Sequence, residues 1–164
     1  MEPLILTENS RISIPSEIIS SSPEETFALG GYLAAHLEKG SIVALEGALG
    51  AGKTLFAKGI AGGLGIMEEL TSPTYTIISE YQGFLPWNKN EPVPVYHIDA
   101  YRLGGDDDFS AIGGEEIVFG NGISIIEWCS HIPGFILPSA FRIDFEILEG
   151  DKRVIRINAG PSGQ

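Results

Sequence analysis

Residues 47–54 read Gly-Ala-Leu-Gly-Ala-Gly-Lys-Thr and have the residue types of a loop that binds phosphate. The segment fits the pattern G-x-x-x-x-G-K-[ST], which occurs where nucleoside triphosphates bind. Its glycines allow the backbone to curl tightly, so that several N–H groups can point at one anion. Lys53 would add a positive charge beside the outer phosphates, and the Thr54 hydroxyl could hold a magnesium ion. The segment therefore predicts a site for a nucleoside triphosphate with Mg²⁺.

The segments on either side of this loop agree with that prediction. Residues 42–46 form an apolar run typical of a buried strand, and Phe56, Ile60 and Leu64 follow the loop at helical spacing. A helix that begins at the loop would direct its positive dipole end and its unpaired N–H groups at the same phosphates. The alternative is an ordinary glycine-rich turn between a strand and a helix. The agreement of the motif with both flanks favours the phosphate site.

Asp99 and Glu127 are the candidates for holding a metal ion or positioning water. Each lies at the end of an apolar segment that is typical of a strand, residues 93–99 and 122–128. In an open α/β sheet the carboxyl ends of the strands carry the ligands, and the phosphate loop would lie along the same edge. Either carboxylate could instead cap a neighbouring helix. With Lys53, these two residues form the predicted catalytic set.

Three further segments bear on this site. Residues 72–74, Ser-Pro-Thr, could sense a terminal phosphate, although their spacing alone favours an ordinary turn. His97 alternates out of phase with Ile98 and is interpreted as packing beside the sheet, with a catalytic role as the less favoured alternative. Residues 88–91 resemble the guanine-reading Asn-Lys-x-Asp motif of GTPases, but no buried strand leads into them and they come too early in the chain. The sequence therefore favours adenine over guanine.

The elements that must position these residues alternate between strand and helix patterns. Ser22, Pro23 and Glu25 predict the start of a helix that reaches about residue 38. We expect strands at residues 11–14, 42–46, 75–81, 93–99, 122–128, 141–148 and 153–158, a second helix at 55–64, a short helix within 103–121, and a mobile loop at 82–92. The last two strands should form an antiparallel hairpin. We predict an α/β, three-layer P-loop fold with a mainly parallel central sheet and antiparallel edge strands.

Composition narrows the classes of protein. The 164 residues are expected to form one domain, 1–164, with residues 1–10 as a loose tail. The net charge is −12 and the ten Lys and Arg residues are scattered, so any contact with tRNA or DNA would go through a partner. A single cysteine, Cys129, and three isolated histidines predict neither a disulfide nor a metal cluster. Without a signal-peptide pattern or an apolar run near the roughly 18 residues that cross a bilayer, a cytoplasmic protein is expected.

The chain resembles the TsaE family, the small bacterial ATPases of tRNA threonylcarbamoyladenosine biosynthesis. The resemblance covers residues 22–160. It rests on segments in a fixed order: Thr26 with Leu29-Gly30, Leu-Gly-Ala-Gly-Lys-Thr at 49–54, Thr-Ser-Pro-Thr-Tyr-Thr at 71–76, Tyr-His-Ile-Asp-Ala-Tyr-Arg at 96–102, Ile-Glu-Trp at 126–128, and Leu137-Pro138. The chain departs from the family pattern at Ala48, Leu55 and Cys129, and most clearly over residues 106–120.

The resemblance implies that the protein binds and hydrolyses ATP with Mg²⁺ and acts with the TsaD and TsaB subunits, of which TsaD modifies tRNA. It also implies that Thr54 and Glu127 are magnesium ligands and that Asp99 serves catalysis or holds a metal-bound water. The residues expected at the nucleotide, from the loop motif and the resemblance together, are Leu49, Gly50, Ala51, Gly52, Lys53, Thr54, Ser22, Thr26, Thr74 and Arg153.

Two alternative functions fit the phosphate loop as well. The first is a small-molecule kinase, although a lid rich in arginine is not evident, because Arg102 is the only arginine between Arg11 and Arg142. The second is a regulatory module that binds a nucleotide without hydrolysing it. Release of phosphate with water alone, only with an acceptor, or not at all would distinguish the three functions.

Overall fold

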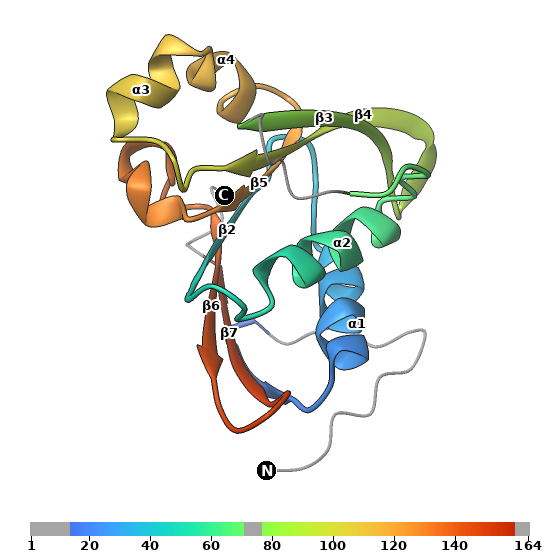
Figure 1. The fold of residues 1–164 in the computed structure, drawn as a ribbon. Coiled ribbons are helices and arrows are strands. Elements are labelled where there is room, and N and C mark those ends of the chain that lie inside the picture. Colours follow the sequence, from blue (N-terminus) through green and yellow to red (C-terminus); the bar gives the residue numbers. More distant parts are fainter. Residues whose placement is uncertain (1–13, 71–76, 160–164) are drawn as a thin grey trace.

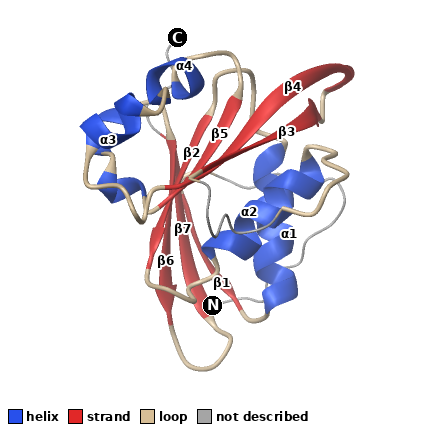
Figure 2. Ribbon diagram, turned by 45° about the horizontal axis from the view of Figure 1, so that its top comes forward, coloured by secondary structure: helices blue, strands red, loops and turns tan. Residues whose placement is uncertain are grey.

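In the computed structural model, which describes residues 14–70 and 77–159, one seven-stranded sheet carries helices on both faces (Figure 1, Figure 2). The strand order is β1-β7-β6-β2-β5-β4-β3. The strands are β1 (Ser16–Ser20), β2 (Ile42–Gly47), β3 (Ile78–Leu85), β4 (Asn88–Asp99), β5 (Ile123–Glu127), β6 (Phe141–Ile147) and β7 (Arg153–Ala159). The helices are α1 (Pro23–Ala34), α2 (Lys53–Gly63), α3 (Asp106–Ala111) and α4 (Gly114–Val118), with 3-10 turns at Cys129–His131 and Pro133–Phe135.

The middle of the sheet is parallel and its two ends are antiparallel. Strand β2 pairs in parallel with β5 and β6, and β5 pairs in parallel with β4. Strand β3 extends one end antiparallel to β4, while β7 and β1 extend the other. The predicted parallel centre with antiparallel edges is confirmed, as is the hairpin of β6 and β7. The three antiparallel pairings equal the three parallel ones in number, so only the centre of the sheet is mainly parallel.

Alternate residues of β2 belong to two separate apolar clusters. Val43 and Leu45 pack with α1 and α2, whereas Ile42 and Ala44 pack with α3, α4 and the 3-10 turns. Because successive side chains of a strand point to opposite faces, the clusters lie on the two sides of the sheet. Figure 2 shows the same arrangement, with α1 and α2 on one side and α3 and α4 on the other. The fold therefore has three layers, with the sheet between two layers of helices and β2 in the middle of the sheet.

Helix α1 begins as predicted and ends earlier than predicted. The Ser22 hydroxyl accepts a hydrogen bond from the Glu25 N–H at 3.2 Å, and the Glu25 carboxylate accepts one from the Ser21 N–H at 2.7 Å. At the other end, the N–H groups of His36 and Leu37 bond three residues back instead of four. Such bonds tighten the backbone into a 3-10 turn, so the α-helix ends at Ala34 and does not reach residue 38.

The prediction that residues 82–92 form a loop is wrong. These residues form the ends of β3 and β4, which make a hairpin with a two-residue turn at Pro86 and Trp87. Leu85 and Val93 bury their side chains in the core beside α2. The Trp87 indole N–H donates a hydrogen bond to the carbonyl oxygen of Leu37 at 3.2 Å, which ties the turn to the segment after α1. Packing of alternate side chains therefore outweighs the local turn signals.

Other boundaries differ by a few residues. The first described strand is Ser16–Ser20, and most of the strand expected at residues 11–14 lies outside the described residues. The strand expected at 75–81 is described from Ile78 onward. The single short helix expected within 103–121 is two short helices, α3 and α4. Residues 71–74 lie outside the described part of the chain.

Helices α1 and α2 approach closely where glycines face backbone. A Cβ atom at Gly59 would lie 1.9 Å from the carbonyl oxygen of Phe27, and one at Gly30 would lie 2.1 Å from the carbonyl oxygen of Phe56. Backbone atoms cannot rotate away as the end of a side chain can. The close approach therefore sets the position of α2, whose first residues carry the predicted phosphate site.

We predict that Gly59→Ala destabilises the protein by about 1–3 kcal/mol, because the added methyl group would force the two helices apart. The matched control is Gly62→Ala on the same helix, where a Cβ atom would meet only the Phe27 ring at an ordinary 3.6 Å. Since alanine favours helix over glycine by about 1 kcal/mol, this control should be neutral or stabilising. Urea unfolding measures both, and equal effects of the two substitutions would contradict the close approach.

Candidate functional site

The segment 47–54 connects β2 to α2, as the sequence predicts, and borders a cavity of about 280 Å³. Gly50 and Gly52 have φ angles of +81° and +107°, in the left-handed region that favours glycine. Helix α2 begins directly at Lys53. Besides residues of the loop and α2, the lining of the cavity includes Asp99 and Glu127. The structure thus brings the loop and both predicted carboxylates together.

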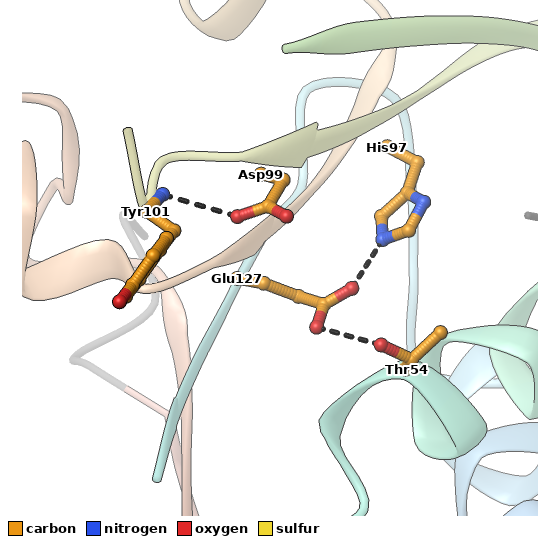
Figure 3. A network of polar contacts seen from close by, with 5 residues as sticks. All are labelled: Thr54, His97, Asp99, Tyr101 and Glu127. Atoms are coloured by element: carbon orange, nitrogen blue, oxygen red, sulfur yellow. Dashed lines mark hydrogen bonds and ion pairs between the residues drawn. The ribbon is translucent and has the colours of Figure 1, made fainter. Parts of the chain in front are cut away.

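Strand pairing explains why the two carboxylates meet. Asp99 at the end of β4 is in register with Glu127 at the end of β5, and Glu127 is in register with Leu45 of β2. Three parallel strands therefore end at one edge of the sheet, where β2 continues into the loop. Asp99 also accepts a hydrogen bond from the Tyr101 N–H at 3.0 Å, and Figure 3 shows its carboxylate on the Tyr101 side of Glu127.

The Glu127 carboxylate lies at the centre of a polar network (Figure 3). Only 4% of Glu127 is exposed. The Thr54 hydroxyl donates a hydrogen bond to Oε1 of Glu127 at 2.9 Å, and Nε2 of His97 lies 2.5 Å from Oε2. One carboxylate thus joins the start of α2 to strand β4, and each of its oxygens has a different partner.

Lys53 extends over the same cavity and is almost fully buried. Its ammonium group donates hydrogen bonds to the carbonyl oxygens of Gly47 and Ala48, the latter at 3.1 Å. Burial lowers the pKa of Lys53 below its usual value, while the charges of Glu127, Glu46 and Asp99 act in the opposite direction. The site therefore holds a desolvated positive charge among acidic groups.

Trp128 is a member of the site to which sequence reasoning gave no role. Its backbone has a φ angle of 59°, in the left-handed region that costs a residue with a side chain about 1–2 kcal/mol. The Lys53 ammonium lies 3.9 Å from the centre of the Trp128 ring, a cation–π contact. Tyr101 and His131 pack on the same indole, with ring centres 5.0 and 6.0 Å away. The available signal was an aromatic residue directly after the strand that ends in Glu127.

His97 is buried beside the sheet, as predicted, but sequence reasoning missed its contact with Glu127. The side chain has no exposed surface. His97 lies two residues before Asp99 on β4, and side chains two apart on a strand share a face. That spacing was the signal that could have placed the imidazole on the side of the carboxylates.

The remaining predicted residues surround the loop at different depths. Arg153 donates a hydrogen bond to the Gly50 carbonyl oxygen at 3.2 Å, so the start of β7 contacts the loop. Thr26 is buried, shares a hydrogen bond of 2.7 Å with the Ser20 hydroxyl, and packs its methyl group under Gly52. Ser22 serves as the cap of α1. Leu49 is 86% exposed at the rim, Ala51 is buried beneath the loop, and Thr74 lies outside the described residues.

The donor atoms at this site are of the kind that Mg²⁺ prefers. In the described part of the chain no group of three or more His, Cys, Asp or Glu side chains is arranged to hold a metal by itself. Mg²⁺ typically keeps several waters and takes one or two carboxylates together with the phosphates of a substrate. The Thr54 hydroxyl, the Glu127 carboxylate and the neighbouring Asp99 supply hard oxygen donors for that type of site. The residues present therefore fit Mg²⁺.

A second set of contacts joins the loop to the segment after Trp128. Oε2 of Glu46 accepts hydrogen bonds from the Ser130 N–H at 2.9 Å and from the Cys129 thiol at 3.4 Å. Burial, followed by the negative charge of Glu46, raises the pKa of Cys129 to about 12. The residue before the loop is thereby tied to the residues that follow β5.

We predict that the Cys129 thiol reacts slowly. At pH 8 a thiol with a pKa of about 12 is roughly one part in ten thousand thiolate, whereas a free cysteine is roughly one quarter thiolate. Iodoacetamide should therefore alkylate the native chain far more slowly than the unfolded chain, with a rate that rises about tenfold for each pH unit while the chain stays folded. Mass spectrometry measures the rate.

The control compares two neighbouring carboxylates. Glu46→Gln should speed alkylation, because Glu46 raises the pKa both by charge and by its hydrogen bond, whereas Asp144→Asn should have a smaller effect. A native thiol that reacts as fast as the unfolded one would show that Cys129 is not held as described.

The chain matches a known protein family and several of its members. Residues 20–155 match the family model described as "Threonylcarbamoyl adenosine biosynthesis protein TsaE". The proteins named tRNA threonylcarbamoyladenosine biosynthesis protein TsaE from Treponema pallidum and Bacillus subtilis are 40% and 38% identical to it, over 85% and 84% of this chain and 97% and 82% of their own lengths. Among the described residues, no helix has the length and apolar character needed to cross a membrane.

A solved structure agrees with these matches. The crystal structure of Bacillus subtilis YdiB superposes with a TM-score of 0.71 at 32% sequence identity, covering 93% of this chain and 90% of that one. The match therefore extends over nearly the whole fold. Sequence, family pattern and three-dimensional structure agree that the chain belongs to the TsaE family, which takes part in tRNA threonylcarbamoyladenosine biosynthesis.

Proposed function

We propose that this chain is a magnesium-dependent ATPase that serves the threonylcarbamoyladenosine modification of tRNA. The observation that carries the proposal is the Thr54–Glu127 hydrogen bond of 2.9 Å in a cavity also lined by Lys53 and the glycine loop. Family membership supports the process, and the loop between β2 and α2 supports a P-loop type of fold and a triphosphate ligand. We also propose that the protein acts in the cytoplasm.

The residues would divide the work as follows. The loop N–H groups and the start of α2 would bind the phosphates. Lys53 would exchange the carbonyl oxygens of Gly47 and Ala48, to which it now donates, for oxygens of the outer phosphates. Thr54 and Glu127 would hold Mg²⁺, which when bound neutralises charge on the phosphates.

Asp99 would orient water, either directly or through the metal shell, for in-line attack on the terminal phosphate. Its position in register with Glu127 keeps it at the same edge of the sheet. Arg153 at Gly50 and Thr26 beneath Gly52 would support the loop from two sides. Ser22, at the cap of α1, and Thr74 are also proposed to lie near the nucleotide.

The strong negative charge of the chain bears on how tRNA is reached. With a net charge of −12, the chain offers little attraction for a phosphate backbone. We propose that the TsaD and TsaB subunits hold the tRNA and that this chain contributes the nucleotide cycle.

We predict that Lys53→Ala and Glu127→Ala impair different properties of the site. Lys53→Ala should lower nucleotide binding or turnover by about a hundredfold or more, because it removes the charge on the outer phosphates. Glu127→Ala should retain much of the binding but lose hydrolysis and the dependence of affinity on Mg²⁺. Calorimetry with ATP, with and without Mg²⁺, together with phosphate release, measures both.

Two matched controls sharpen this test. Lys58→Ala removes a positive charge from the same helix but outside the cavity, and should leave binding unchanged. Glu127→Gln keeps an oxygen that can accept from Thr54 but removes the charge, and should also lose Mg²⁺ dependence. Retained Mg²⁺ dependence in both Glu127 variants would exclude the ligand role, and phosphate release only with an acceptor would indicate a kinase.

We predict that the tagged chain captures TsaD and TsaB in the presence of ATP, and that Lys53→Ala captures less of both.

The purified chain alone should not change the electrophoretic mobility of tRNA at moderate salt. A tight shift of tRNA by this chain would contradict the indirect route, and capture that is the same without nucleotide would contradict a role for ATP in assembly.

A further inference from the structure

His97 is a buried polar side chain that the proposed hydrolysis does not use. It comes from β4 and its imidazole has no exposed surface. Its Nε2 lies 2.5 Å from Oε2 of Glu127, while its Nδ1 is buried and without a hydrogen-bond partner among the described residues. The imidazole is thus buried with one directed contact, to the carboxylate at the centre of the site, and its role there needs an explanation.

The chemistry of the contact between His97 and Glu127 determines which of the two groups carries the shared hydrogen. An ionised carboxylate only accepts hydrogen bonds, so the hydrogen between the two groups belongs to Nε2. With the hydrogen on Nε2, this tautomer carries a lone pair on Nδ1, which is the nitrogen that lacks a partner among the described residues. The contact therefore selects the Nε2–H tautomer of His97.

The same contact selects one orientation of Glu127. A glutamate side chain has several rotatable bonds, and ordering it costs up to about 2 kcal/mol of conformational entropy. The bond from His97 fixes Oε2, and the bond from Thr54 fixes Oε1, so the two partners define the plane of the carboxylate from opposite sides. Figure 3 shows Glu127 between the two. The register of β4 with β5 keeps the imidazole beside it, because His97 faces Ile125, two residues before Glu127.

We propose that His97 is a positioning residue that holds Glu127 with Oε1 turned toward Thr54 and toward the magnesium ion of the proposed function, on which this inference rests. Without the imidazole, Oε2 would lose its donor in a buried place and the carboxylate would be free to turn. Partners that orient a metal ligand in this way typically change metal affinity or activity by about 10–100-fold when removed. A histidine that only fills the core would affect stability and nothing else.

Three substitutions separate these two roles. In His97→Gln the amide nitrogen can reach the position of Nε2 and donate to Glu127. In His97→Asn the amide reaches only to the position of Nδ1, and His97→Leu fills the volume without a donor. The Gln and Asn variants are thus matched in chemistry and differ in reach.

The measurement is the gain in ATP affinity on adding Mg²⁺, by calorimetry, alongside urea unfolding of each variant. We expect His97→Asn and His97→Leu to lose about 10–100-fold of this gain, with little change in affinity in the absence of Mg²⁺. We expect His97→Gln to keep most of it. If the Leu variant does not fold, the contrast between Gln and Asn decides. Variants that lose stability but keep the full gain, or a Gln variant as impaired as Asn, would overturn the proposal.

A spectrum of the wild-type protein tests the contact without any ligand. In ¹⁵N-labelled protein, His97 should show a protonated Nε2 and an unprotonated Nδ1, and Glu127→Gln should change the Nε2 signal. The Nδ1–H tautomer would overturn the proposal whatever the nucleotide data show. A wild-type chain whose ATP affinity does not respond to Mg²⁺ would overturn the proposed function and this role together, whereas equal gains in all variants would overturn the role of His97 alone.

Discussion

The burial of the Glu127 carboxylate is the constraint on which the site depends. An ionised carboxylate removed from water is strongly unfavourable unless hydrogen bonds and opposite charge compensate it. Here the compensation comes from separate parts of the chain, the Thr54 hydroxyl at the start of α2 and His97 on β4, with the positive charge of Lys53 near by. Each partner is useful only if its element is held in place. The parallel register of β4 and β5 and the glycine contacts between α1 and α2 do so.

The same argument explains the environment of Lys53. Its ammonium is buried, bonds to carbonyl oxygens of its own loop, and lies over the Trp128 ring, which a left-handed backbone conformation presents to it. Strained backbone positions concentrate where a side chain must be held against the local preference. Lys53, the neighbouring carboxylates and the Trp128 indole therefore interact electrostatically with one another. Within the proposed function, an incoming triphosphate would replace the carbonyl oxygens as the partner of the lysine.

Features that depend on neighbouring residues were predictable from the sequence. These include the glycine loop, the cap at Ser22, and the strands ending in Asp99 and Glu127, because each leaves a pattern within a few residues. Features that depend on long-range packing were not. The hairpin at residues 82–92 has the prolines and asparagines of a loop, yet Leu85 of β3 and Val93 of β4 are buried in the core against α2. The contact between His97 and Glu127 spans thirty positions and appears only when the order of the strands is known.

On the proposed function, the carboxylates of Asp99 and Glu127 act together with Thr54 on one metal ion beside the glycine loop. The most direct measurement is a crystal structure with Mg²⁺ and a non-hydrolysable ATP analogue. We predict that the ion contacts the Thr54 hydroxyl, and that both carboxylates lie within direct or water-bridged reach of it while the phosphates occupy the loop. An ion from which both carboxylates are farther than one bridging water would contradict this account.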